Sequence, residues 1–184
     1  MPTNKGFTLL ELLLVVGIAA ALLVGGLWAA IAVQETHRVT EVVRLVNMIR
    51  SETNRLRFEM AVADDTDLEA LLLAKGRIGH RFIDEGNNLI MTPYSSEAYA
   101  ASVHARANAV TEIGFAIPPA KAIELYSQFP VNASQDIVRF DVCGLVITLA
   151  NAGTVGTPDN VANSCGSSKT VPTVENVAIH FALQ

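Results

Sequence analysis

The feature that most constrains this chain of 184 residues is an apolar run near its start. From Phe7 to Val33 the sequence holds no Lys, Arg, Asp or Pro, and Glu11 is the one carboxylate within it. As a helix this run would extend about 40 Å, whereas the core of a bilayer is about 30 Å thick. We therefore predict a helix that crosses a membrane. Glu11 needs a separate explanation, because an unpaired carboxylate is costly in lipid.

The residues that follow indicate that the helix continues and becomes amphipathic. No Gly or Pro stands between Leu27 and Met60, and charged residues fill most positions outside one apolar stripe. The stripe recurs at spacings of three, four or seven, with Thr53 at the skipped position: Val39, Val42, Val46, Ile49, Leu56 and Met60. We predict one helix from about Phe7 to about Met60, roughly 80 Å long, whose second half packs on a globular domain.

The rest of the chain predicts an α+β head with an antiparallel sheet of roughly three to five strands. Short helices are expected after Asp65, ending at Gly76, and after Pro118. The Ala-rich stretch 96–108 is expected to form a helix or a long surface loop, and 150–170, rich in Asn, Gly, Thr, Ser and Pro, a loop. Strands are expected where apolar residues alternate or cluster between turn residues: 89–91, 112–117, 137–142, 145–149 and 174–184.

The chain has two cysteines, Cys143 and Cys165. An apolar N-terminal segment implies export, and exported chains reside where thiols oxidise. Two cysteines can pair in only one way within a chain, and a metal site would need further ligands at close spacing. We predict a structural disulfide that ties the 150–165 loop to the sheet and stabilises the head by about 3 kcal/mol.

Composition and motifs argue against several functions. The net charge is −5 without a tight basic cluster and aromatic residues make up 6%, so no nucleic-acid site is expected. The chain has no G-x-S-x-G, H-E-x-x-H, C-x-x-C or Gly-rich phosphate loop, so we expect no catalytic residues, no cofactor and no metal. Asp64, Asp65 and Asp67 are interpreted as a helix start, because they lack the spacing of a calcium loop. His80 and His180 suggest no site.

The stretch Lys5-Gly6-Phe7-Thr8-Leu9-Leu10-Glu11 resembles the class III signal of type IV pilins and related pseudopilins. That signal is a short basic leader ending in Gly, then Phe or another apolar residue, then Glu as the fifth residue after the cleavage point, followed by a long apolar helix. The resemblance implies that a prepilin peptidase cleaves after Gly6 and N-methylates Phe7. It also implies that Glu11 compensates the N-terminal amine of a neighbouring subunit, which makes a buried carboxylate tolerable.

The resemblance implies a domain plan. Residues 1–6 would be the leader, 7–60 the N-terminal pilin helix with 7–33 in the membrane or filament core, and 61–184 the α+β head. The short leader and Phe7 resemble the type IVa class, whereas the mature length and the body resemble the type IVb class, so both subclasses stay open; the family has a comparable C-terminal segment bounded by cysteines. Many type IVa pilins carry prolines in the N-terminal helix; here the loosening role would fall to glycines, namely Gly17, Gly25 and Gly26.

The implied function is that of a structural subunit of a type IV pilus. The precursor would lie in the inner membrane of a Gram-negative bacterium, and the pilus assembly machinery would polymerise the processed chain, through its N-terminal helix, into an extracellular homopolymer. Such filaments serve adhesion, DNA uptake, conjugation or motility. A minor pilin or a type II secretion pseudopilin is the alternative within the same resemblance.

A secreted soluble binding domain remains the alternative from another class. Ala30-Ile31-Ala32 has the small-x-small pattern of a signal-peptidase site, so cleavage after Ala32 would release the body. Two features count against it. The apolar run is longer than an ordinary signal core of about 7–15 residues, and Glu11 lies inside the run.

Overall fold

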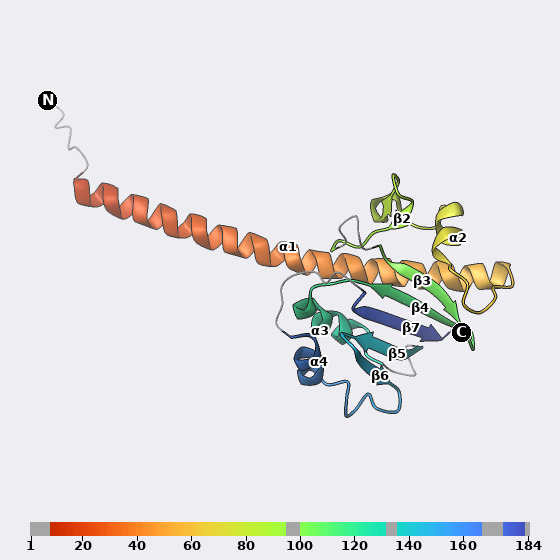
Figure 1. The fold of residues 1–184 in the computed structure, drawn as a ribbon. Helices are drawn as coiled ribbons and strands as arrows, with labels where there is room; N and C mark the ends of the chain where they lie inside the picture. Colours follow the sequence, from red (N-terminus) through yellow and green to blue (C-terminus); the bar gives the residue numbers. More distant parts are fainter. Residues whose placement is uncertain (1–7, 95–99, 132–135, 167–174, 183–184) are drawn as a thin grey trace. The chain divides into compact units, whose positions relative to one another are not determined.

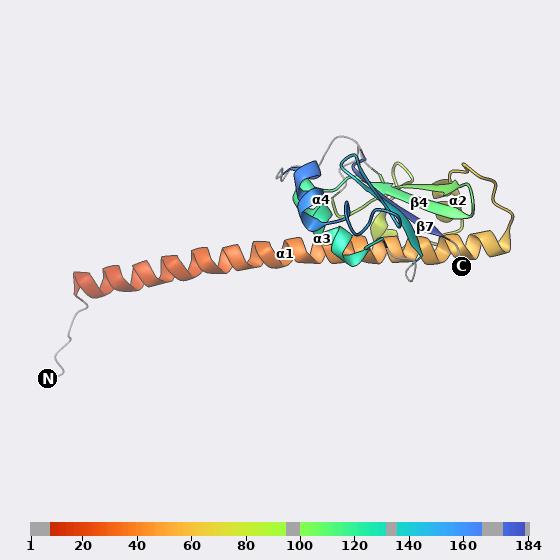
Figure 2. The same ribbon diagram turned by 90° about the horizontal axis from the view of Figure 1, so that it is seen from below.

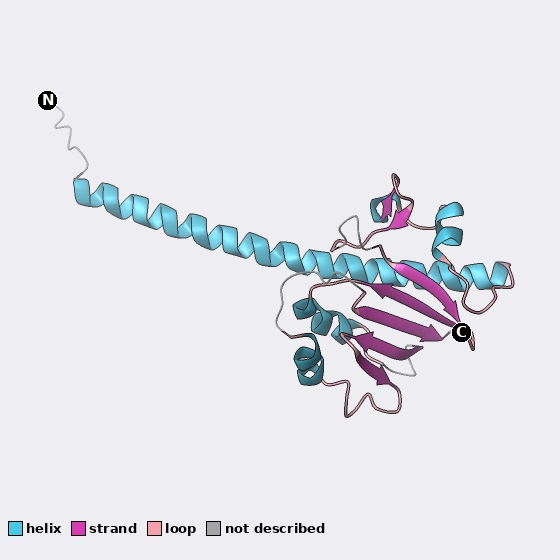
Figure 3. Cartoon of the chain, viewed as in Figure 1, coloured by secondary structure: helices cyan, strands magenta, loops and turns pink. Residues whose placement is uncertain are grey.

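The computed structural model describes residues 8–94, 100–131, 136–166 and 175–182. Contacts within the chain divide it into two compact units, Met1–His37 and Arg38–Gln184. The first element, helix α1, is Leu9–Glu59 and contributes to both units (Figures 1 and 3). The predicted long helix, its amphipathic second half and the α+β class are confirmed.

In the first unit the described residues belong almost entirely to α1. The large apolar side chains between Leu9 and Val33 are exposed all round the helix, Leu9 and Trp28 each at 79%. Open space surrounds Gly17, Gly25 and Gly26. Among the described residues α1 is long and apolar enough to cross a membrane. A helix that is apolar on every side is stable only when lipid or other helices cover it.

The second unit begins where α1 acquires a buried stripe. The buried residues of α1 follow the helical spacing expected from the sequence: Val39, Val42, Leu45, Val46, Ile49, Thr53 and Leu56. Leu45 extends the predicted stripe by one position. Met60 follows the end of the helix and is only half-buried.

A five-stranded antiparallel sheet packs on this stripe, and Figure 2 shows it lying over α1. Its strand order is β3-β4-β7-β5-β6, so the C-terminal strand β7 occupies the centre. The strands are Ser102–Arg106 (β3), Val110–Phe115 (β4), Ile137–Val142 (β5), Leu145–Thr148 (β6) and Val177–Ala182 (β7). Most of the alternate residues that face α1 are apolar and buried, including Ile113, Phe140 and Ile179, and Thr111 on β4 is a buried polar residue on this face.

Two helices complete the core on the same face of the sheet. Helix α3 is Pro119–Gln128, and its Tyr126 ring meets Phe140 edge-on with centroids 5.1 Å apart. Just after α3, Phe129 meets Phe181 edge-on at 6.2 Å. Helix α4, Pro158–Cys165, contacts α3 and buries Val161. These aromatic contacts stabilise the packing of α3 beneath β5 and β7.

The segment between α1 and β3 forms a small layer of its own. It contains α2 (Glu69–Ala74), the 3₁₀ helix η1 (His80–Phe82) and the short paired strands β1 (Ile83–Asp84) and β2 (Leu89–Ile90). This layer packs on the main core through three buried residues, Leu68, Leu72 and Phe82.

Two predictions for the head were wrong. Residues 102–106 form strand β3 rather than a helix or a loop, with Val103 and Ala105 buried between outward-facing neighbours. The 150–170 stretch contains α4 and is not loop throughout. Thr157 caps α4 by accepting a hydrogen bond from the Asn160 N–H, and Pro158 opens it. The turn-rich composition concealed this capped helix.

Candidate functional site

The start of α1 is organised around Thr8 and Glu11. The Glu11 Oε2 atom accepts hydrogen bonds of 2.9 Å from both the Thr8 backbone N–H and the Thr8 hydroxyl. The Glu11 N–H in turn donates to Thr8 Oγ1 at 3.3 Å. This reciprocal pattern is a capping box, in which a Thr at the N-cap and a Glu three residues later satisfy free backbone N–H groups.

The capping box gives Glu11 a role within its own chain. The T-x-x-E spacing of Thr8 and Glu11 is the sequence signature of this cap, and the sequence interpretation did not use it. Both bonds end on Oε2, and no described residue donates to Oε1. One carboxylate oxygen of Glu11 is therefore used in hydrogen bonds that cap the start of α1. Gly6 and Phe7, the predicted processing residues, lie outside the described residues.

The surface that follows Glu11 is apolar on all sides. Between Leu12 and Val33, the exposed fractions of the large side chains range from 52% to 79%. Nothing in the described chain packs against this surface. An exposed apolar area of this size marks a surface that contacts a membrane or another protein. A carboxylate at one end and an apolar cylinder beyond it define the candidate assembly site.

The head carries the predicted disulfide between Cys143 and Cys165, with Cα atoms 5.1 Å apart. Cys143 and Gly144 form the two-residue turn between β5 and β6, with φ angles of 50° and 82°. Two positive φ values in a two-residue hairpin match the twist of the strands, and Gly144 accommodates its value without a Cβ penalty. The disulfide joins this turn to the last residue of α4.

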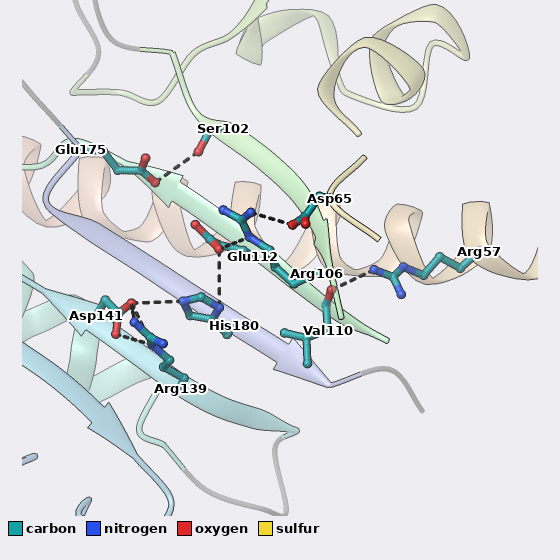
Figure 4. A network of polar contacts seen from close by, with 10 residues as sticks. All are labelled: Arg57, Asp65, Ser102, Arg106, Val110, Glu112, Arg139, Asp141, Glu175 and His180. Atoms are coloured by element: carbon teal, nitrogen blue, oxygen red, sulfur yellow. Dashed lines mark hydrogen bonds and ion pairs between the residues drawn. The ribbon is translucent and has the colours of Figure 1, made fainter. Parts of the chain in front are cut away.

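A row of charged side chains crosses the face of the sheet opposite α1 (Figure 4). His180 on β7 lies between Glu112 on β4 and Asp141 on β5, with ring-to-carboxylate distances of 3.8 Å and 3.2 Å. Arg106 binds Glu112 and also Asp65, at 2.5 Å and 3.0 Å. The described residues contain no group of three or more His, Cys, Asp or Glu that could hold a metal ion.

Arg139 completes this row, and an open hollow lies above it. The Arg139 guanidinium contacts Asp141 through Nε at 2.8 Å and Nη2 at 2.7 Å. The hollow has a volume of about 590 Å³, and all the residues of the row line it. Its lining combines the carboxyl groups of Asp65, Glu112 and Asp141 with the guanidinium groups of Arg106 and Arg139.

Burial and neighbouring charges set the protonation of this row. Burial lowers the pKa of His180, despite the opposing effect of Glu112 and Asp141. Burial would raise the pKa of Glu112, but the hydrogen bond from Arg106 and nearby positive charge outweigh it, so that pKa is lowered. Hydrogen bonds to carboxylates raise the pKa values of Arg106 and Arg139. The row therefore contains two Arg–carboxylate pairs around a histidine biased toward its neutral form.

Comparison with known proteins identifies the N-terminal segment. Residues 1–32 match the prokaryotic N-terminal methylation motif, the class III signal of type IV pilins. No curated protein and no solved structure matches the chain. The predicted resemblance is thus confirmed for the N-terminal segment.

The fold and the site together define a class of protein. A long N-terminal helix, apolar in its first half, precedes an antiparallel-sheet head, which is a pilin-like α+β architecture. With the methylation motif, these features support a prepilin-type protein made as a membrane-anchored precursor. The motif also implies processing by a prepilin peptidase.

Proposed function

We propose that this chain is a structural subunit of a type IV pilus. The precursor enters the inner membrane through the apolar part of α1, and prepilin peptidase cleaves after Gly6 and methylates Phe7. The processed subunits then polymerise through their N-terminal helices into an extracellular filament. The role is structural rather than catalytic.

One observation carries this proposal: the methylation motif is followed directly by a helix whose apolar surface has no partner within the described chain. The membrane covers that surface in the precursor, and the helices of other copies cover it in a filament. Glu11 then has a second task. Glu11 is the fifth residue after the proposed cleavage point, and its carboxylate compensates the new Phe7 amine of an adjacent copy.

The mass of the intact protein recovered from bacterial cells tests the proposal. We expect a chain that begins at Phe7 and carries one additional methyl group on its amine. A chain that begins at Val33 would show secretion through signal peptidase and would refute the filament role.

Mechanical shearing of cells provides a second measure. A main subunit dominates the sheared filaments, whereas a minor pilin or pseudopilin is present at low copy number.

A further inference from the structure

His180 occupies an unusual position for a buried histidine. Its exposed fraction is 8%, and its two ring nitrogens each face a carboxylate from a different strand. Two further titratable groups lie beside the row: His104 on β3, which is opposite Glu112, and Glu175, which accepts a hydrogen bond from Ser102. A change in the charge of the ring therefore changes the electrostatic interactions between three adjacent strands, β4, β7 and β5.

The geometry limits what a neutral ring can do. Neutral imidazole has one N–H group, so only one of its nitrogens can donate to a carboxylate. The shorter contact, from Nε2 to Asp141 Oδ2, is the one at hydrogen-bond distance. The Nδ1 atom lies 3.8 Å from Glu112 Oε2, beyond a hydrogen bond. The arrangement thus suits a neutral ring that donates to Asp141.

The two arginines explain why two carboxylates do not hold the ring in its charged form. Arg106 contacts Glu112, and Arg139 contacts Asp141 through two of its nitrogens. Each carboxylate therefore already has a positive partner. With these charges compensated, the cost of burying an imidazolium decides the outcome.

We infer that Arg106 and Arg139 keep His180 uncharged at neutral pH, so that mild acidification places an additional positive charge between β4, β7 and β5 and weakens the head. In the unfolded chain the ring titrates near its ordinary pKa of about 6.5. In the folded head that pKa is lowered, so the folded state binds fewer protons than the unfolded state. Its contribution to stability is present above pH of about 6.5 and is lost as pH falls through the folded pKa.

An NMR titration of the histidine rings in the full chain, held in detergent micelles, tests this inference. His180→Gln identifies the His180 signal, and His80, which lies in η1 and contacts Glu85 at 3.4 Å, is the control signal. We expect the His180 midpoint to lie below the ordinary histidine pKa of about 6.5. Arg139→Gln should raise the His180 midpoint and leave His80 unchanged, because Asp141 then lacks its positive partner. An unchanged or lower midpoint in Arg139→Gln would overturn the inference.

Denaturant unfolding of the same proteins gives a second measure. The wild-type chain should lose stability as the pH falls below the ordinary histidine pKa of about 6.5. His180→Gln should lose less over that range, whereas His80→Gln should behave as the wild type. Equal losses in His180→Gln and the wild type would show that the pH dependence of stability arises from other residues, and would refute the inferred role of His180.

Discussion

At the scale of single residues, Glu11 has one role that the structure shows and a second that we propose. In the structure its carboxylate caps the helix that it belongs to, through the Thr8 backbone N–H and hydroxyl. In the proposed filament the same carboxylate compensates an amine of another copy. A cap needs a hydrogen-bond acceptor, which Gln also provides, whereas charge compensation needs the negative charge. The two functions therefore respond differently to substitution.

Two substitutions at the capping box separate these functions. Glu11→Gln should leave processing intact but strongly reduce filament yield, because it keeps an acceptor and removes the charge. Thr8→Ala removes the N-cap at a cost of about 0.5–2 kcal/mol and keeps the charge, so filament yield should stay near that of the wild type. Immunoblots of sheared and membrane fractions give the yields, and intact mass confirms processing. Normal filaments in Glu11→Gln with reduced yield in Thr8→Ala would restrict Glu11 to a capping role.

At the scale of elements, both edges of the sheet are covered by the chain itself. On β3 the backbone around Thr66 forms the cover: the Asp65 and Leu68 N–H groups donate to β3 carbonyls at 2.7 Å and 2.8 Å. On β6 a single side chain does so. The Asn151 amide donates to the Val146 carbonyl at 3.1 Å and accepts from the Thr148 N–H at 2.7 Å. Covered edges disfavour strand-to-strand association of heads, which is compatible with the assembly through α1 that we propose.

Loss of the Asn151 side chain should uncover the β6 edge. Asn151→Ala removes two hydrogen bonds and should lower the free energy of unfolding by about 1–3 kcal/mol, while Asn151→Asp keeps the acceptor and should lose less. The uncovered edge lies next to exposed Val146 and Leu149, so the alanine variant should also form oligomers. Denaturant unfolding and light scattering in detergent measure both effects. Asn163→Ala, on the exposed side of α4, is the matched control and should change neither.

The sequence predicted the elements whose signals are local and missed those that depend on context. Strand β5 was predicted at its observed bounds, because apolar and polar residues alternate along it. In β3 the same alternation is present, but Ala105 carries part of it, and the Ala-rich composition of 96–108 suggested a helix or a long surface loop. At the N-terminal site the motif predicted the role of Glu11 toward other molecules. Its internal bond to Thr8 was overlooked, although Thr and Glu three residues apart indicate it.

At the scale of the whole molecule, the residues of α1 that belong to the core of the described head begin at Val39. The apolar surface of α1 before His37 contributes nothing to the core of the described head. The apolar residues that α1 buries from Val39 to Leu56 belong to that core. Each such side chain contributes about 1.5–3 kcal/mol, so together they supply roughly 9–18 kcal/mol. A typical domain is stable by only about 5–15 kcal/mol. Loss of the buried α1 residues is therefore expected to unfold the head.

Two truncations under oxidising conditions test this division. A fragment of residues 38–184 should be soluble without detergent, contain the disulfide and unfold cooperatively, because it keeps the buried stripe and loses the apolar surface. A fragment of residues 61–184, the predicted head, should not fold, since the sheet would expose the face that α1 covers. Circular dichroism and NMR chemical-shift dispersion distinguish the two states. In the longer fragment, Leu45→Asp should reproduce the failure, because Leu45 is 1% exposed and has no partner for a charge in the core. A folded 61–184 fragment would show instead that the sheet and its short helices form a sufficient core, and that α1 packs on a head that is already complete.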